Sequence, residues 1–496
     1  MADTAAPPAG QTSLSAGRAA RTVGWAVVSL AGSKLVVFVT TLAMARLLVP
    51  EQFGVVAAGL TLIALVETGL DLGVGAAVVY EQETGVSDRI RTAFTLNLLV
   101  AAVLTVTAVT SAPLVAALFG VPDDVLLLQV LFGYLLLRGA GQVPDAVLRR
   151  DLRFKRRAVV EISRAGVRAV VSIGLAVGGA GAWSLVGGLL AGELVGTVAT
   201  WWAIRFVPRL RIDRSVAATL LRFGGAVLAI RLLTAVGENA DYVVVGNRLG
   251  PEDLGLYLLA VRVPELFLAN IYWIVSSVAF SLFSRVRAVH AEEFGSVVLR
   301  ALRLITVPAF AAAAGLVVVA EDLTGVLLGD TWAGAAGPMA LIAVAMGVSA
   351  IAYASGDVFP AIGRPGVLAR VLVPVVLLRV LALLAAAPHG LVAIAGAQLV
   401  VSVVNAVVRL VLVHRLVRLS GRALLGALVP AAVTATGALL GAVPVTSLMA
   451  PGPGRLAATV VAGAGTAVLL LRLLAPAALD DIVGVVRSAT SRQAVR

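Results

Sequence analysis

Apolar residues fill long stretches of this chain, and short segments with arginine, proline or glycine separate them. Each stretch is about twenty residues long, the length that an α-helix needs to cross ~30 Å of hydrocarbon. The stretches lack the short alternation and the aromatic girdles of a membrane barrel. We therefore predict an all-α polytopic membrane protein. About fourteen spans are expected, at roughly 22–45, 54–79, 92–111, 125–147, 158–179, 183–204, 218–243, 254–282, 302–320, 337–359, 369–387, 391–413, 424–442 and 456–475.

The composition supports a membrane location. Hydrophobic residues make up 60% of the 496 positions and charged residues only 13%, with a mean hydropathy of +1.02. Soluble globular proteins have an apolar share near ~45–50%. Since the segment before the first span has no charged start followed by a short apolar core, we expect that span to be retained and not cleaved as a signal peptide.

The distribution of arginines predicts the orientation in the membrane. Even-numbered connections between the spans are rich in arginine, whereas odd-numbered ones hold few. The positive-inside rule therefore places both termini in the cytoplasm, which accounts for the net charge of +12 without any nucleic acid. The basic connections contain Arg89 and Arg91; Arg149 to Arg157; Arg205 to Arg214; Arg285, Arg287, Arg300 and Arg303; Arg364; and His414 to Arg422.

Several kinds of chemistry are disfavoured by the residues present. With no cysteine and three histidines, the chain offers no disulfide, no thiolate and little basis for a histidine metal centre. The connections are short: Ser111 to Asp124 and Ala320 to Gly334 are among the longest outer ones. We see no phosphate-binding loop and no loop pair of carboxylates. The sequence therefore predicts a protein that is not an enzyme and holds no cofactor or metal.

A short motif occurs twice, as "RLLVPEQFG" from Arg46 and as "NRLGPEDLG" from Asn247. The copies are 201 residues apart, and six spans fit into that offset, so both units have the same orientation. Proline followed by an acid is also a common helix start. The matching positions nevertheless favour two six-helix lobes in parallel pseudo-repeat. We expect a disordered cytoplasmic tail at 1–20, an N-lobe at 21–215, a C-lobe at 216–423, two further helices at 424–475 and a basic cytoplasmic tail at 476–496.

Three longer stretches resemble a known family. They run from Gly24 to Val79, from Arg149 to Gly192, and from Leu221 to Leu266 as "LRFGGAVLAIRLLTAVGENADYVVVGNRLGPEDLGLYLLAVRVPEL". They are similar to the polysaccharide-export branch of the MATE-like flippase superfamily, which includes lipopolysaccharide, O-antigen and teichuronic-acid type flippases. The resemblance covers nearly the whole chain and is strongest in its first half.

The resemblance implies a function and its partners. It implies two lobes facing a central cavity, and a polyprenyl-pyrophosphate-linked oligosaccharide carried from the inner to the outer leaflet of the bacterial plasma membrane by alternating access. Membrane lipids and the polymerase and glycosyltransferases of the same pathway are the other partners expected. The resemblance also implies cavity cations on the first, second, seventh and eighth helices.

Charged residues inside the predicted spans suggest where the site lies. A charge at bilayer depth costs at least ~2.5–3.5 kcal/mol, so such residues normally face a polar interior. A diphosphate needs fixed positive charge when it leaves water, and lysine or arginine supplies it. We predict substrate binding by Lys34, Arg231 and Arg262. We predict charge balance, or coupling to Na⁺ or H⁺, for Glu67, Asp71 and Glu265.

Other buried charges are interpreted as structural. For Arg138, Glu193, Asp357 and Arg379 we favour ion pairs between helices over a role in the cavity. Glu238 and Asp241 are expected to be solvated near the outer end of the seventh helix.

Two alternatives to a flippase remain. A MATE-type drug or cation antiporter would share the fold, although such exporters usually stop at twelve helices. A polytopic polymerase or ligase for surface glycans is disfavoured by the short outer connections.

Overall fold

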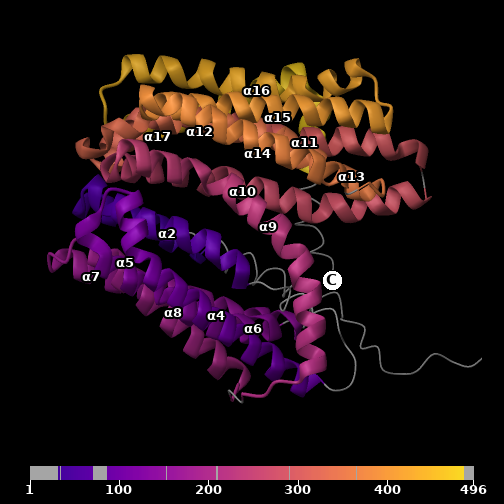
Figure 1. Cartoon of the computed structure of the whole chain (residues 1–496). Helices are drawn as coiled ribbons and strands as arrows, with labels where there is room; N and C mark the ends of the chain where they lie inside the picture. Colours follow the sequence, from indigo (N-terminus) through magenta and orange to yellow (C-terminus); the bar gives the residue numbers. More distant parts are fainter. Residues whose placement is uncertain are drawn as a thin grey trace, which may run out of the picture.

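A computed structural model describes residues 32–33, 35–70, 86–151, 153–207, 210–289, 291–364 and 366–484, and within them every regular element is helical. Ten of the described helices are long and apolar enough to cross a membrane, as expected for a multi-pass membrane protein. The chief helices, shown in Figure 1, are α2 (Pro50–Leu70), α4 (Val86–Leu118), α5 (Val125–Phe132), α6 (Tyr134–Arg150), α7 (Phe154–Val177), α8 (Ala182–Ile204), α9 (Arg214–Leu249), α10 (Pro251–Val289), α11 (Phe294–Asp322), α12 (Ala336–Gly356), α13 (Val358–Ala361), α14 (Gly366–Ala386), α15 (Leu391–Val417), α16 (Gly421–Leu448) and α17 (Pro453–Leu474).

All fourteen predicted spans overlap described helices. Ten correspond to the helices that are able to cross a membrane. The other four overlap the short apolar helix Leu35–Leu47 and the helices α7, α9 and α10. In α7 the first four residues alone contain three cationic ones, "FKRR", which lowers its mean hydropathy.

Two segments fold differently from the prediction. The span expected at 125–147 is divided at Gly133 into α5 and α6, and a glycine inside a helix is a common place for such a break. The segment from Ala320 to Gly334, expected to be a loop, continues α11 into a π-helical turn at Leu323–Leu328 and a 3-10 helix at Asp330–Ala335. Trp332 in that 3-10 helix is fully buried, so this segment is part of the packed core.

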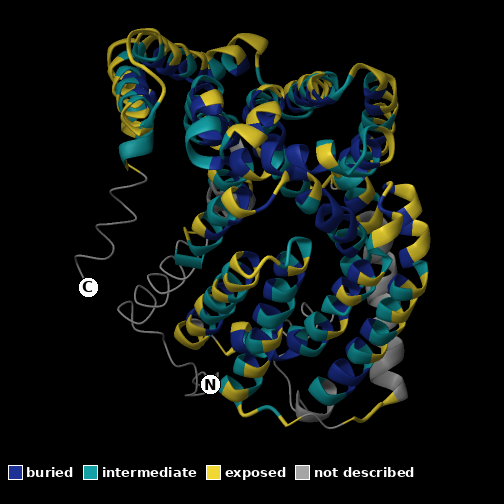
Figure 2. Ribbon diagram, turned by 90° about the vertical axis from the view of Figure 1, so that its left-hand side faces the viewer, coloured by how far each residue is buried: buried dark blue, intermediate teal, exposed yellow. Residues whose placement is uncertain are grey.

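The outer surface of the described bundle is largely apolar. Many large hydrophobic side chains are exposed, among them Leu114, Val170 and Val461, each with more than 70% of its area accessible. Figure 2 shows the buried residues where helices face one another and the exposed ones on the outer faces. A continuous apolar surface of this kind suits contact with lipid tails.

The helices form two groups that meet at one end. In Figure 1, α2 to α8 lie on one side and α10 to α17 on the other, with α9 crossing between them. The groups join where α2 packs along α9 and α10, and they diverge from there (Figure 1). The predicted lobes at 21–215 and 216–423, with two further helices at 424–475, stay a prediction.

The repeated motif forms the closest contact between the two groups. A Cβ atom added to Gly54 would lie 1.7 Å from the carbonyl oxygen of Pro251. Reciprocally, a Cβ on Gly255 would lie 1.8 Å from the carbonyl oxygen of Pro50. Only glycine permits two helix backbones to approach this closely. We call the segments Pro50–Gly54 and Pro251–Gly255 the repeat contact, and it places both copies of the motif at the same end of the bundle, as the repeat predicts.

A second pair of contacts reinforces the repeat contact. Arg46 donates from Nε to the carbonyl oxygen of Leu327 over 2.9 Å, and Asn247 donates from Nδ2 to the carbonyl oxygen of Leu118 over 2.8 Å. Arg46 and Asn247 occupy the same position of the two motifs. Asn247 thus binds the last residue of α4, and Arg46 binds the π-helical turn that continues α11. Carbonyls at a helix end have no partner within the helix.

The last two long helices pack outside the second group. α16 packs against α11, and α17 against α16. Both oxygens of the buried Asp322 carboxylate accept from Nε of Arg455, at 3.0 and 2.8 Å. This ion pair joins the end of α11 to the start of α17.

Candidate functional site

A cavity of about 670 Å³ lies between the two groups and extends into the second. One wall is the apolar face of α2 around Thr61, and the others come from α9, α10, α12, α14 and α15. Its lining includes three arginines and three acids, together with tyrosines, amides and hydroxyls. A polar cavity among membrane-spanning helices is typical of a transport pathway.

A row of polar side chains on α15 forms one wall of this cavity. Gln398, Ser402, Asn405 and Arg409 are spaced by four, three and four residues, which places them on one face of the helix. α9 has a similar row, with Thr234, Glu238 and Asp241 in the lining. Such rows in otherwise apolar helices create a polar interior while the opposite faces remain suited to lipid.

Asp241 lies at the closed side of the cavity and is not solvated, so the expectation for it was wrong. It is only 4% exposed. Its carboxylate accepts hydrogen bonds from the Tyr257 hydroxyl at 2.8 Å and from Nε2 of Gln398 at 2.5 Å. Its Oδ1 also accepts from the amide of Tyr242 at 3.0 Å. The position of Asp241 near the end of α9 suggested that water would solvate its carboxylate. Hydrogen-bond donors from three helices solvate it instead. Glu238 is exposed and lines the cavity.

Arg262 and Glu265, both predicted as site residues, line the cavity and form an ion pair. The distance from Nη1 of Arg262 to Oε2 of Glu265 is 2.8 Å, and the two side chains are 52% and 40% exposed. An ion pair this accessible contributes little to stability. Arg262 is therefore available to exchange its carboxylate partner for an anionic ligand.

Arg379 lines the cavity as well, although the sequence favoured a purely structural role. Its Nη1 donates to the carbonyl oxygen of Gly237 at 2.8 Å, which links α14 to α9. Its Nε is buried and has no hydrogen-bond partner within the described residues. The guanidinium thus connects two helices and keeps one buried donor that has no partner within the described residues.

The remaining predicted residues fall into different places. Arg231 is exposed on α9 and lies on the same helical face as Glu238, but it does not line the cavity. Lys34 and Asp71 lie outside the described residues. Asp357 is partly buried at the junction of α12 and α13.

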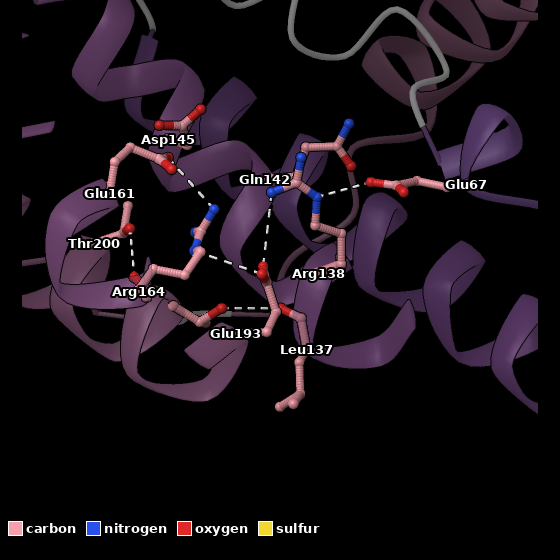
Figure 3. A network of polar contacts seen from close by, with 12 residues as sticks. Glu67, Leu137, Arg138, Gln142, Asp145, Glu161, Arg164, Glu193 and Thr200 are labelled. Atoms are coloured by element: carbon pink, nitrogen blue, oxygen red, sulfur yellow. Dashed lines mark hydrogen bonds and ion pairs between the residues drawn. The ribbon is translucent and has the colours of Figure 1, made fainter. Parts of the chain in front are cut away.

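Glu67 belongs to a separate network in the first group, shown in Figure 3. Its Oε1 accepts from Nε of Arg138 at 2.8 Å. Arg138 also approaches Glu193 at 3.7 Å, and Nε of Arg164 approaches the other oxygen of Glu193 at 3.5 Å. Arg164 in turn contacts Glu161 at 3.4 Å. The ion pairs predicted for Arg138 and Glu193 are thereby confirmed.

Sequence reasoning missed Arg164 and Arg409. Arg164 lies within the stretch "RRDLRFKRRAVVEISRAGVRAVV", where the many cations near the membrane surface conceal it. Arg409 follows Gln398, Ser402 and Asn405 in an otherwise apolar segment. The helical spacing of those four polar residues was the signal for a cavity wall.

The fold and the cavity define a class of protein, a polytopic membrane transporter built from two helix groups around a polar interior. Within that class, the family described as "Polysaccharide biosynthesis protein" matches residues 43–337. This match covers more than half of the chain, and the chain belongs to that family.

Curated relatives agree with the family. Succinoglycan biosynthesis transport protein ExoT of Rhizobium meliloti (strain 1021) is 29% identical over 329 residues, 66% of each chain, so the match spans just under two thirds of that relative's length. Teichuronic acid biosynthesis protein TuaB of Bacillus subtilis (strain 168) is 26% identical over 68% of this chain and 70% of its own. The matched relatives are bacterial, which implies that this multi-pass protein lies in the inner (plasma) membrane.

Solved structures show the same fold. Lipid II flippase MurJ, in an inward closed conformation, superposes with a TM-score of 0.73 at 11% identity, covering 92% of this chain and 99% of its own. An inward-facing multidrug resistance MATE transporter of the MOP superfamily gives 0.65 at 16% identity, over 79% and 98%. The expectation that this chain is a transporter and not an enzyme agrees with these comparisons.

Proposed function

We propose that this protein moves a polyprenyl-pyrophosphate-linked oligosaccharide, a precursor of a surface polysaccharide, from the inner to the outer leaflet of the plasma membrane. The observation that carries the proposal is the polar cavity between α2 and the second group, lined by charged residues at membrane depth. An oligosaccharide headgroup needs such an interior to leave water, while its lipid tail stays in the bilayer. A drug exporter shares the fold, but the family speaks for a polysaccharide precursor.

We further propose fourteen spans with both termini in the cytoplasm, and alternating access between two lobes at 21–215 and 216–423, flanked by the helices at 424–475. The basic connection from Arg149 to Arg157 follows the end of α6 that lies away from the repeat contact. Since basic connections face the cytoplasm, the repeat contact lies at the outer face. In this arrangement the structure is closed to the outside.

Roles for the charged residues follow from this proposal. We assign contact with the pyrophosphate to Lys34, Arg231 and Arg262. Glu67, Asp71 and Glu265 balance these charges or couple transport to Na⁺ or H⁺. The contact of Glu67 with Arg138 favours charge balance for Glu67. The polymerase and glycosyltransferases of the pathway are the proposed partners.

Deleting the gene tests the function itself. We expect the surface polysaccharide to disappear and the polyprenyl-linked oligosaccharide to accumulate at the inner leaflet, because glycan assembly precedes the blocked step. Lipid extraction with mass spectrometry measures the intermediate, and antibody labelling measures the polymer. A deletion strain with normal polymer and increased drug sensitivity would instead identify an exporter of drugs.

The double variant Arg231→Ala, Arg262→Ala tests the pyrophosphate site. Export is expected to fall at least about tenfold, because a charge-assisted hydrogen bond contributes about 1.5–3 kcal/mol. Polymer restored in the deletion strain is the measurement, with immunoblotting of membranes to show that the variant accumulates. Arg248 and Arg415, exposed near the ends of α9 and α15, provide the matched control pair. Full export by the double variant would remove both arginines from the proposed site.

A further inference from the structure

Arg409 differs from the other two arginines of the cavity. Arg262 is paired with Glu265. Arg379 donates to the carbonyl of Gly237 and lies near enough to Glu238 and Asp241 for electrostatic attraction. No carboxylate among the described residues lies within ion-pair distance of Arg409, whose hydrogen-bond partners are neutral. A charge inside a membrane protein without an opposite charge beside it is costly, so its position indicates an anionic ligand.

Neutral groups hold the Arg409 guanidinium in a defined orientation. Its Nε donates to Oδ1 of Asn405 at 3.1 Å, and its Nη1 donates to the carbonyl oxygen of Ala352 at 3.1 Å. These contacts leave Nη2 of Arg409 and Nδ2 of Asn405 without partners among the described residues. Both are donors from adjacent turns of the same face of α15. Oriented donors of this kind suit a planar carboxylate, which accepts two hydrogen bonds at once.

An aromatic surface belongs to the same cavity. The rings of Tyr272 and Tyr353 are stacked, with centroids 4.6 Å apart and an interplanar angle of 17°. The Tyr272 hydroxyl donates to the carbonyl of Met346, which fixes its ring. Tyr353 is 51% exposed and lies near enough to Arg409 for an electrostatic interaction. A flat aromatic ring with nearby amide and hydroxyl groups suits the apolar face and the hydroxyls of a sugar ring.

The charge at Arg409 argues against a diphosphate at this position. Arg262, assigned above to the pyrophosphate, lies on α10, whereas Arg409 on α15 supplies a single positive charge, which does not neutralise the two negative charges of a diphosphate diester. Because Arg262 is paired with Glu265 and Arg379 is attracted to Glu238 and Asp241, the charge of Arg409 is left to match one carboxylate. A sugar acid with a single negative charge therefore fits better than the pyrophosphate.

We propose that this part of the cavity binds an acidic sugar of the cargo. Arg409 and Asn405 bind its carboxylate, and Tyr353 packs against its ring. The inference deepens the proposed function, because the oligosaccharide headgroup brings the sugar into the cavity. It predicts that the protein selects precursors carrying a uronic acid or a similar carboxylated sugar.

Binding to the purified full-length protein in detergent tests this site without any transport assay. The probe is digalacturonate, and its dimethyl ester has the same rings without the charge. Wild-type protein is expected to bind the acid at least about tenfold more tightly than the ester, by titration calorimetry. Arg409→Gln should abolish that preference, Arg409→Lys should retain part of it, and Asn405→Ala should weaken binding of the acid a few-fold. Arg415→Gln, on the same helix but exposed, should match the wild type.

Three outcomes would overturn the proposal. The first is equal binding of acid and ester by the wild type. The second is an unchanged preference for the acid in Arg409→Gln. If that variant does not fold, unchanged binding of the acid by Asn405→Ala takes its place. The third is inorganic pyrophosphate that binds the wild type, is lost in Arg409→Gln and displaces digalacturonate, which would make the cargo's diphosphate the ligand. Each of these leaves the deletion phenotype intact, so failure of the site is distinguishable from failure of the proposed function.

Discussion

Alanine at both Gly54 and Gly255 is expected to stop export while the protein still reaches the membrane. Each new Cβ would lie less than 2 Å from a backbone carbonyl of the other group, and a helix backbone has no side-chain rotation with which to relieve the clash. Overpacking typically costs about 1–3 kcal/mol at each position. The helices must separate at the repeat contact, so the state seen here is destabilised relative to one in which this end is open.

The change in conformation is measurable directly. Since the chain has no cysteine, spin labels on cysteines introduced at Leu114 and Thr331 report one distance without background. Both positions are exposed, and they lie in opposite groups near the repeat contact. We expect the double alanine variant to shift the distance distribution to longer values. The population ratio of the open to the closed state should rise about tenfold or more, because each 1.4 kcal/mol changes an equilibrium tenfold.

Gly69 supplies the matched control within α2. A Cβ there would meet Cδ1 of Leu104 at 3.5 Å, an ordinary contact. Gly69→Ala should therefore leave both export and the distance distribution unchanged. If the double variant exports normally with an unaltered distribution, the repeat contact is not what closes this end of the protein.

The spans were predictable from sequence because lipid imposes a simple rule on composition. A helix in hydrocarbon needs about twenty apolar residues whatever its neighbours are. The division of α5 from α6 depends on more than that rule, since Gly133 is one of 50 glycines and many others lie inside unbroken helices. The helical turns after α11 were missed for a related reason. They depend on α2, whose Phe53 packs edge-on against Trp332 with ring centroids 5.0 Å apart, and on Ala45, whose carbonyl accepts from Nε1 of Trp332.

The site was predictable where a charge interrupts an apolar stretch, and unpredictable where other helices decide its surroundings. Arg262 and Glu265 stand out in the sequence, and both line the cavity. Asp241 stands out equally, but its burial depends on Tyr257 and Gln398, which are 16 and 157 residues further along the chain. Its position along α9 alone suggested that Asp241 would be solvated. Asp241, which the sequence placed in solvent, is therefore buried inside the second group.

The repeat has a physical meaning that its sequence alone did not specify. A proline and an acid at a helix start need no partner, so the motif was compatible with an ordinary turn. The glycine at the end of each copy is needed because a side chain there would clash with the backbone of the other copy. Because Gly54 meets Pro251 and Gly255 meets Pro50, the same short sequence serves as both halves of one self-complementary contact.

Glu193→Leu is expected to cause the largest loss of stability among single changes in the first group. Glu193 is 4% exposed and approaches both Arg138 and Arg164. Its removal leaves two guanidinium groups without their shared carboxylate. Breaking a buried pair costs about 3–5 kcal/mol, and we expect about 3, because Arg138 is 37% exposed and keeps Glu67. Thermal unfolding in detergent measures the loss.

Two further variants separate the network's structural role from a role in transport. Glu161→Gln removes the more accessible partner of Arg164, and a loss of only about 0.2–0.5 kcal/mol is expected. Glu193→Leu combined with Arg164→Met removes both charges, and apolar replacement of a buried pair is often neutral. The double variant should thus recover most of the lost stability and export normally. Restored stability without export would mean that these charges take part in transport, whereas an unfolding temperature unchanged in Glu193→Leu would show that the pairs contribute nothing to the fold.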